Sequence, residues 1–405
     1  MSARGQLPEG MQDTLMGESV RKRCIERQLR TLFSLSGYAE IETPVLEYFR
    51  TFDDEVYGFD DHHVWKTFDR QGHVLAVRPD NTIPAVRVAA SRLREEPLPL
   101  RLCYLQSVAS YPQEGSAAPC ESTQAGVELM GEVSAPADAE IIALAIRSLQ
   151  EAGLKEFQID LGQVAFFKGF MQEAGLTKEQ TETFRRYVEE KNVLAMQLFL
   201  RECAVPGEVS RRLMELPQLY GGEEVLAKAE AITKNSLCQK AVSNLRQILD
   251  ALAAYGLREH ISIDLGMVHA VNYYSGMIFR GITGYLGQPL LSGGRYDGLP
   301  AKFGRPMPAT GFGLSVSLLL AALSRQGDAF PLTKAGYVLG MSKRGLPEAL
   351  AWADEKRGEG VSVSLQYGAT KEDLIRLVDV GRAQDAAWAA EGGVVVWSRE
   401  EQAWK

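Results

Sequence analysis

Three groups of residues in this chain have types that could serve phosphate, metal or thiol chemistry. The run Ser292–Arg295 is rich in glycine, but it lacks the lysine and the following helix start of a phosphate-binding loop. His62 and His63 follow Asp60 and Asp61 in a polar stretch that is more typical of a solvated loop than of a metal site. The cysteines form no CxxC or Cys/His cluster, so we expect no zinc site, no disulfide framework and no cofactor. They are Cys24, Cys103, Cys120, Cys203 and Cys238.

More informative are six short segments that follow one another in a distinctive order. They are Leu7–Asp13 (LPEGMQD), Gly37–Glu47 (GYAEIETPVLE), Arg78–Thr82 (RPDNT), Gln124–Glu128 (QAGVE), Tyr273–Tyr274 and Gly293–Leu299 (GGRYDGL). In this order they resemble the characteristic segments of class II histidyl-tRNA synthetases. No single segment is decisive, but all six together support the family strongly, and the likeness covers roughly residues 1–325.

The resemblance implies a pocket for histidine. The candidate histidine-binding residues that it implies are Asp80, Thr82, Gln124, Glu128, Tyr273, Tyr274 and Tyr296. The first three would lie near the ammonium group, whereas Glu128, Tyr274 and Tyr296 would lie near the imidazole ring. An ammonium group needs an anionic partner, and each imidazole nitrogen needs a hydrogen-bond partner. Glu128 would accept the imidazole N–H in a charge-assisted hydrogen bond.

A second interpretation of the same residues stays open. Asp80, Gln124 and Glu128 would then only hydrogen-bond one another inside a degenerate core, as relics of an earlier pocket. Asp80 is also one methylene shorter than the glutamate of the synthetase family, which shortens its reach toward an ammonium group.

The chain departs from the synthetases where they carry out phosphate chemistry. Adenylation adds negative charge to the α-phosphate in the transition state, and those enzymes stabilise it with arginines. Counted without gaps back from Gln124, the arginine of motif 2 becomes Ser110 and the adenine-reading glutamate becomes Pro112. The arginine four residues before the tyrosine pair becomes His269, and the arginine at the end of motif 3 becomes Leu318. A neutral imidazole does not replace a permanently charged guanidinium at pH 7.

These losses argue against an enzyme. Removing one charge-stabilising donor typically costs about 3 kcal/mol, a hundredfold or more in rate. We therefore expect no catalytic residue in this chain. The pattern resembles the regulatory-subunit family of ATP phosphoribosyltransferase, which accompanies a short-form catalytic subunit. That resemblance implies a role in the first step of histidine biosynthesis, with histidine as the feedback effector and the reaction itself left to the partner.

The resemblance also implies self-association. The segment Tyr38–Glu47 and the helix before it build a two-fold dimer in class II enzymes, so we expect a dimer that assembles further with catalytic subunits. Two alternatives stay open. One is an active histidyl-tRNA synthetase, and the other is a synthetase paralogue that acts as an amino-acid-binding module in another pathway. The tyrosine pair and Gly293–Leu299 favour the histidine branch.

Composition restricts the partners and the compartment. The 405 residues include 44 lysines and arginines against 52 aspartates and glutamates, a net charge of −8. Such an acidic balance disfavours a nucleic-acid partner, which needs clustered cations to displace counterions. The N-terminus has no apolar signal core, and no apolar run approaches about 18 residues, so we expect a cytoplasmic protein without a membrane partner.

The element pattern, with the resemblance, predicts an α+β fold with an antiparallel sheet of the class II synthetase type flanked by helices. We expect two core segments, 1–162 and 257–328, around a helical insertion at 163–256. Residues 329–405 alternate strands and helices, which is typical of a small α/β unit.

Individual elements follow from the hydrophobic periodicity. We expect strands at Tyr38–Leu46, interrupted by Pro44, and at Met277–Ile282, and helices at Asp138–Ala152 and Val316–Ser324. In the last segment we expect strands at 337–339, 361–365 and 394–397 and helices at 346–356 and 371–380. The similar runs FQIDLG (157–162) and ISIDLG (261–266) read as a chance likeness between two buried strands.

Overall fold

A computed structural model describes residues 5–52, 63–111, 119–268, 273–327 and 335–405. Pro112 and His269, two of the lost catalytic positions, lie outside these ranges, as do His62, Asp60 and Asp61. The chain divides into two compact units. The larger takes in Met1–Thr14 and Arg21–Asp328, and the smaller takes in Leu15–Val20 and Ala329–Lys405. Within the described ranges, no helix is both long and apolar enough for a membrane span.

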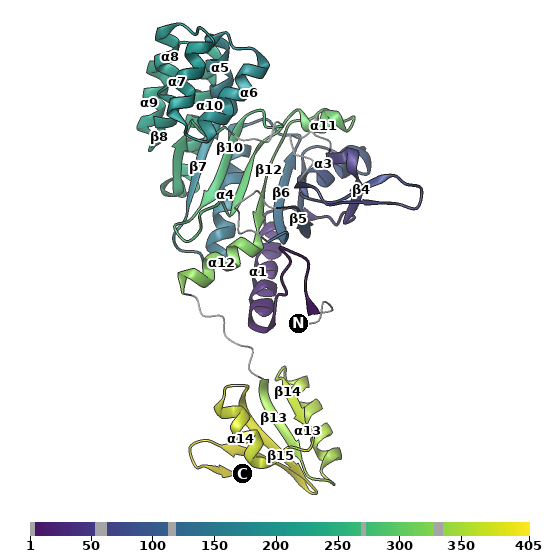
Figure 1. Ribbon diagram of the computed structural model, residues 1–405. Coiled ribbons are helices and arrows are strands. Elements are labelled where there is room, and N and C mark those ends of the chain that lie inside the picture. Colours follow the sequence, from purple (N-terminus) through teal and green to yellow (C-terminus); the bar gives the residue numbers. More distant parts are fainter. Residues whose placement is uncertain (1–4, 53–62, 112–118, 269–272, 328–334) are drawn as a thin grey trace. The chain divides into compact units, whose positions relative to one another are not determined.

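A nine-stranded sheet organises the larger unit (Figure 1). In spatial order its strands are β1 (Ala39–Glu40), β5 (Leu100–Ala109), β6 (Glu121–Met130), β12 (Ala309–Ser315), β11 (Leu291–Arg295), β10 (Met277–Ile282), β7 (Gln158–Gln163), β9 (Ile261–Asp264) and β8 (Tyr220–Gly221). The pairs β1–β5 and β7–β9 are parallel, and the other pairs of this sheet are antiparallel. The expected α+β fold is present, but the sheet is mixed rather than purely antiparallel.

Helices cover this sheet. They include α1 (Met16–Leu35), α3 (Thr82–Ser91), α4 (Ala135–Glu151), α11 (Leu299–Lys302) and α12 (Val316–Gln326). The side chain of Ser134 caps α4 by accepting from the N–H of Ala137, and Ile141, Ile142 and Leu149 of α4 are fully buried. Helix α3, which the sequence pattern did not predict, packs with β5 residues in one apolar cluster. It begins at the RPDNT segment and so positions Asp80 and Thr82.

A separate three-stranded sheet has the order β2-β4-β3, with β2 at Leu46–Tyr48, β3 at Lys66–Phe68 and β4 at Val74–Val77, and the 3-10 turn η2 (Phe49–Phe52) follows β2. The expected interruption of the Tyr38–Leu46 strand around Pro44 is present, but the two parts are short and belong to different sheets, β1 and β2. Arg78 accounts for the break, since its guanidinium donates to the carbonyl oxygens of Thr43 and Pro44 and so takes up two acceptors that a strand would use.

The predicted insertion is mostly helical. Its helices are α5 (Val164–Ala174), α6 (Lys178–Glu189), α7 (Val193–Glu202), α8 (Gly207–Leu213), α9 (Glu224–Ile232) and α10 (Ser236–Ala254), and short 3-10 turns lie at η4 (Leu216–Gln218) and η5 (Arg258–His260). The segment also contributes strand β8, which pairs with β9 at the sheet edge. Helix α10 packs on both α4 and α5. The division of residues 1–328 into separate domains stays a prediction.

The two similar sequence runs lie side by side as the parallel strands β7 and β9. Ile159 pairs with Ile261, so the structural register is shifted by two residues from the sequence likeness. Asp160 and Asp264, which correspond in the two runs, both bind Arg280, at 3.0 and 3.3 Å. The sequence did not indicate that one guanidinium would join the two runs.

The smaller unit has a five-stranded sheet with the order β14-β13-β15-β16-β17. Its elements are β13 (Ala335–Met341), α13 (Leu346–Gly358), β14 (Val363–Gln366), α14 (Lys371–Asp379), β15 (Ala383–Ala390), β16 (Gly393–Ser398) and β17 (Ala403–Trp404). Strand β15 (AQDAAWAA) was missed because alanine is poor in strands. Small side chains are needed on both faces of this strand, because helices pack there. Ala387 lies in an apolar cluster with residues of α13, Ala386 lies in one with residues of α14, and both are fully buried.

Candidate functional site

Strand β6 presents three residues of the QAGVE segment to one face of the large sheet. Side chains alternate along a strand, so Gln124, Gly126 and Glu128 point to the same side. Across the antiparallel pairings, Tyr104 of β5 lies opposite Gly126, and Gly311 of β12 lies opposite Glu128. The site is therefore assembled on the adjacent strands β5, β6 and β12 of the sheet.

Glycines on β12 make room for these side chains. A Cβ added to Gly311 would lie 1.8 Å from Oε2 of Glu128, and one added to Gly313 would lie 2.6 Å from Nε2 of Gln124. No larger residue fits at Gly311 while Glu128 keeps this position. The carboxylate and the amide thus lie directly over the backbone of β12.

Glu128 is a fully buried carboxyl group. Its Oε1 accepts a hydrogen bond from the hydroxyl of Tyr104 at 3.0 Å, and its Oε2 accepts one from the hydroxyl of Tyr296. Burial raises the pKa of Glu128 to about 8, even though both phenol donors favour the charged form. Such a group can exchange a proton with a ligand near neutral pH.

Asp80 and Gln124 form a second polar group beside it. The Gln124 amide donates to Oδ2 of Asp80 at 3.1 Å and accepts from the backbone N–H of Asn81 at 2.9 Å. Oδ1 of Asp80 accepts from the N–H of Ile83 at 3.2 Å, in the first turn of α3. Burial raises the pKa of Asp80, and these donors partly offset the rise.

Three tyrosines and Thr82 complete the walls of a small cavity next to these polar groups. The hydroxyls of Thr82 and Tyr104 lie 3.3 Å apart, and the ring of Tyr273 contacts the rings of Tyr274 and Tyr296 at centroid distances of 4.8 and 5.8 Å. Together these groups enclose a cavity of about 40 Å³. Its described lining residues are Asp80, Thr82, Gln124, Tyr273, Tyr274, Ser292, Tyr296, Gly311, Phe312 and Gly313.

The structure therefore brings the seven candidate residues together. Six of them line the cavity, and the seventh, Glu128, is tied to it through the hydroxyl of Tyr296. A cavity of about 40 Å³ has room for a few waters but not for an amino acid, because a single water already needs about 10–15 Å³ by the same measure. Of the mutual bonds that the relic interpretation expects, the structure shows the one between Asp80 and Gln124, whereas Glu128 bonds Tyr104 and Tyr296.

Comparisons with known proteins decide the family. A family model described as histidyl-tRNA synthetase matches residues 10–319. The chain is 40% identical to the ATP phosphoribosyltransferase regulatory subunit of Acetivibrio thermocellus, over 88% of this chain and 86% of that one. It is 37% identical to the protein of the same name from Moorella thermoacetica, over 95% and 98%. The chain belongs to the family of ATP phosphoribosyltransferase regulatory subunits.

Solved structures similar to this chain support the same family assignment. The crystal structure described as an ATP phosphoribosyltransferase regulatory subunit/histidyl-tRNA synthetase from Bacillus halodurans C is 34% identical, with a TM-score of 0.87, and the match covers 96% of this chain and 99% of that one. Histidyl-tRNA synthetase from Nostoc sp. PCC 7120 is 17% identical, with a TM-score of 0.81 over 99% and 96% of the two chains. The latter likeness shows the fold alone, which confirms the class II synthetase-like architecture.

Two of the positions where the synthetases carry an arginine, Ser110 and Leu318, lie in the described part of this chain. Both hold neutral side chains. Ser110 follows β5, and its backbone N–H donates to the carbonyl oxygen of Cys120 at 2.9 Å. Leu318 lies in the first turn of α12, where its N–H donates to the side chain of Ser315 at 3.3 Å. Among the described residues that line the cavity, none is cationic.

Two arginines of the same sheet, Arg280 on β10 and Arg295 on β11, serve other partners. Arg280 binds Asp160 and Asp264, as described above, and Arg295 forms a buried ion pair with Asp138 at 2.7 Å. A guanidinium already saturated by buried carboxylates is costly to redirect, because the carboxylates would be left unpaired. These two arginines do not replace the ones that the synthetases use.

Tyr104 is the site residue that sequence reasoning missed. It is buried, it donates to Glu128, and a Cβ at Gly126 would lie 2.5 Å from its hydroxyl oxygen. Within RLCYL it reads as one more apolar position of a strand. Only the register of β5 against β6 places its hydroxyl beside the carboxylate, and a sequence pattern does not specify that register.

Proposed function

We propose that this chain is a non-catalytic regulatory subunit required by a short-form ATP phosphoribosyltransferase, and that it supports feedback inhibition by histidine. The partner would join ATP to phosphoribosyl pyrophosphate in the first step of histidine biosynthesis. The observation that carries the proposal is a cavity lined by Asp80 and several hydroxyl groups, with the buried Glu128 beside it and no cation among its described lining residues. Phosphoryl chemistry needs preorganised positive charge at the transition state.

Histidine is the ligand that the polar groups suit best. Asp80 and Gln124 offer a carboxylate and an amide to an ammonium group, and Glu128 with Tyr296 offers an acceptor and a donor to an imidazole ring. An aliphatic amino acid would form no hydrogen bond with Glu128, which would keep only its phenol donors Tyr104 and Tyr296. The pocket would thus discriminate through the additional hydrogen bonds that an imidazole forms.

The small cavity supplies the regulatory element of the proposal. A volume of about 40 Å³ requires the walls to move before histidine enters. Binding then favours a wider conformation of the Asp80–Gln124 pair and the tyrosines. An effector shifts an equilibrium only through its differential affinity for two states, and a closed and an open pocket provide those states.

We also propose a dimer built through α1 and the segment Tyr38–Glu47, located in the cytoplasm, where the partner's nucleotide substrate is abundant. Leu35 at the end of α1 is 84% exposed, and Val45 and Leu46 are exposed on the same segment. Exposed apolar side chains close together in sequence are typical of an interface between copies.

Mixing the purified chain with a short-form catalytic subunit tests the proposal. We expect the two to co-elute, the catalytic rate to rise at least tenfold, and histidine to inhibit the complex. An unchanged rate without co-elution would contradict the partnership. Activation without any inhibition by histidine would leave the regulatory subunit in place but contradict histidine as its effector.

A further inference from the structure

The three-stranded sheet β2-β4-β3 carries a second pocket, which shares no lining residue with the Asp80–Glu128 cavity. Its volume is about 320 Å³, and its described lining residues are Tyr48, Phe49, Arg50, His73 and Val74. It lies where β2 runs into η2 beside the start of β4. A volume of this size accepts one or two side chains of another protein.

Apolar side chains on this small sheet are unusually exposed. Tyr48 is 46% exposed, Val74 38% and Phe68 69%. In Figure 1 the hairpin that contains β4 reaches outward from the nine-stranded sheet, so a partner has free access to it. Contiguous exposed apolar groups with a polar rim mark interaction sites on otherwise ordinary surfaces.

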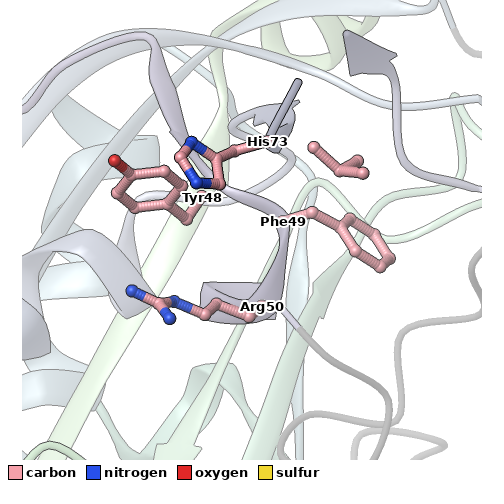
Figure 2. Close-up of a pocket in the computed structure, with 5 residues that line it drawn as sticks. Tyr48, Phe49, Arg50 and His73 are labelled. Carbon is pink, nitrogen blue, oxygen red and sulfur yellow. The ribbon is translucent and has the colours of Figure 1, made fainter. Parts of the chain in front are cut away.

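Cations rest on the aromatic rings of this pocket. The guanidinium of Arg50 lies 5.1 Å from the ring centroid of Tyr48, and the ammonium of Lys66 lies 4.1 Å from that of Phe49. Figure 2 shows the rings of Tyr48 and His73 next to each other, 5.9 Å apart and edge to face, with Arg50 below them. Among the residues that the structure describes, Arg50 has no carboxylate partner.

These positive groups stand out on an acidic chain. The net charge is −8, and the ring of His73 in this pocket lies against a carboxylate, with Nδ1 2.8 Å from Oδ2 of Asp69. Arg50 lies over the ring of Tyr48, and its guanidinium donates to no side chain or carbonyl oxygen within the part of the chain that the structure describes. A planar guanidinium that is oriented before binding pairs with a carboxylate at a lower entropic cost.

We propose that this pocket docks the catalytic subunit of the complex, by receiving an acidic side chain of that subunit next to an aromatic or aliphatic one. The carboxylate pairs with Arg50, and the apolar neighbour covers Tyr48, Phe49 and Val74. This inference rests on the proposed function. Because the proposed dimer contact ends at Glu47, a dimer presents one such pocket on each copy for the partner.

Charge reversal at Arg50 tests the docking site. We expect Arg50→Glu to weaken the affinity for the catalytic subunit at least tenfold, measured by calorimetry, and to lower the activation in parallel. Tyr48→Ser, which removes the ring under Arg50, should weaken the affinity in the same direction. Arg94→Glu is the matched control, because Arg94 is exposed and lies outside the pocket, and it should bind within about twofold of wild type.

Other results of these experiments would separate a failure of the docking site from a failure of the proposed function. Wild-type affinity in both Arg50→Glu and Tyr48→Ser would overturn the docking site while leaving the proposed function intact. If light scattering shows that Arg50→Glu instead converts a wild-type dimer to monomers, the occupant is a second copy and the inference is wrong. A wild-type chain that fails to bind the catalytic subunit at all contradicts the proposed function itself.

Discussion

At the residue scale, the chemistry of the site depends on a carboxyl group that the fold has removed from water. Glu128 keeps two phenol donors and no described cation, so its charge is stabilised by hydrogen bonds alone. An imidazole is a suitable partner for such a group, because it can supply either an N–H or a proton. Two predictions follow from this residue.

Replacing Glu128 by glutamine should weaken histidine binding by about 1–3 kcal/mol, because an amide cannot exchange a proton with the imidazole and loses one acceptor oxygen. Calorimetry on the purified chain measures the change. Glu121→Gln is the control, since Glu121 is exposed on the same strand and should bind histidine like the wild type. Equal histidine affinity in the Glu128 variant would place the effector elsewhere.

The stability of the protein should depend on the protonation of Glu128. Its folded pKa of about 8 lies above the ordinary 4.5, so its contribution is complete below about pH 4.5 and is lost as the pH rises toward 8. The free energy of unfolding, measured in urea between about pH 5 and pH 8, should fall less steeply in Glu128→Gln than in the wild type. Parallel curves for the two proteins would contradict the buried carboxyl.

At the element scale, the site exists because β12 lacks side chains where β6 needs space. Gly311 and Gly313 leave the backbone bare, so Glu128 and Gln124 can lie across it. Small residues have a similar effect in β15 of the smaller unit, where alanines allow α13 and α14 to pack closely against the sheet. Both features are properties of packed strands rather than of any single motif.

Gly311→Ala should abolish histidine binding within calorimetric detection, because its Cβ would occupy the position of the Glu128 carboxylate. The free energy of unfolding should drop by about 1–3 kcal/mol for the same reason. Gly284→Ala is a suitable control, since nothing lies within 4 Å of its added Cβ. If Gly311→Ala binds histidine like the Gly284 variant, the space that Gly311 leaves for the Glu128 carboxylate has no role in the site.

Ala387→Leu should destabilise the smaller unit by about 1–3 kcal/mol, because it overfills a fully buried position between β15 and α13. Hydrogen exchange of the amides in 335–405 reports on this unit separately from the rest of the chain. Gln384→Leu, an exposed position on the same strand, should leave the exchange rates close to those of wild type. Matching rates in the two variants would mean that β15 is not packed as described.

Particular elements show what a sequence can and cannot predict here. Ordered motifs predicted the class II fold, and periodicity predicted β10 and α12, because long-range packing and local pattern agree there. Periodicity did not predict β15 or β8. In β15, pairing with β13 overrides the low strand propensity of alanine. Strand β8 is only two residues long and exists because it pairs with β9. Tyr104 and the size of the closed cavity depend on register and side-chain packing, which no local pattern specifies.

At the scale of the whole molecule, a synthetase-like fold is retained while its described cavity lining holds no cation. The family relationship is shown by sequence and structure, and the proposed complex explains why such a scaffold would keep a histidine pocket without phosphate chemistry. A regulatory subunit gains from a pocket that closes when empty, since ligand binding then changes its conformation.

Measuring histidine binding and adenylate formation on the same purified chain tests the central claim most directly. We expect calorimetry to show saturable histidine binding, and histidine-dependent exchange of pyrophosphate into ATP to stay at background. Exchange above background would show that arginines do reach the pocket and that the chain is an active synthetase, which contradicts the account.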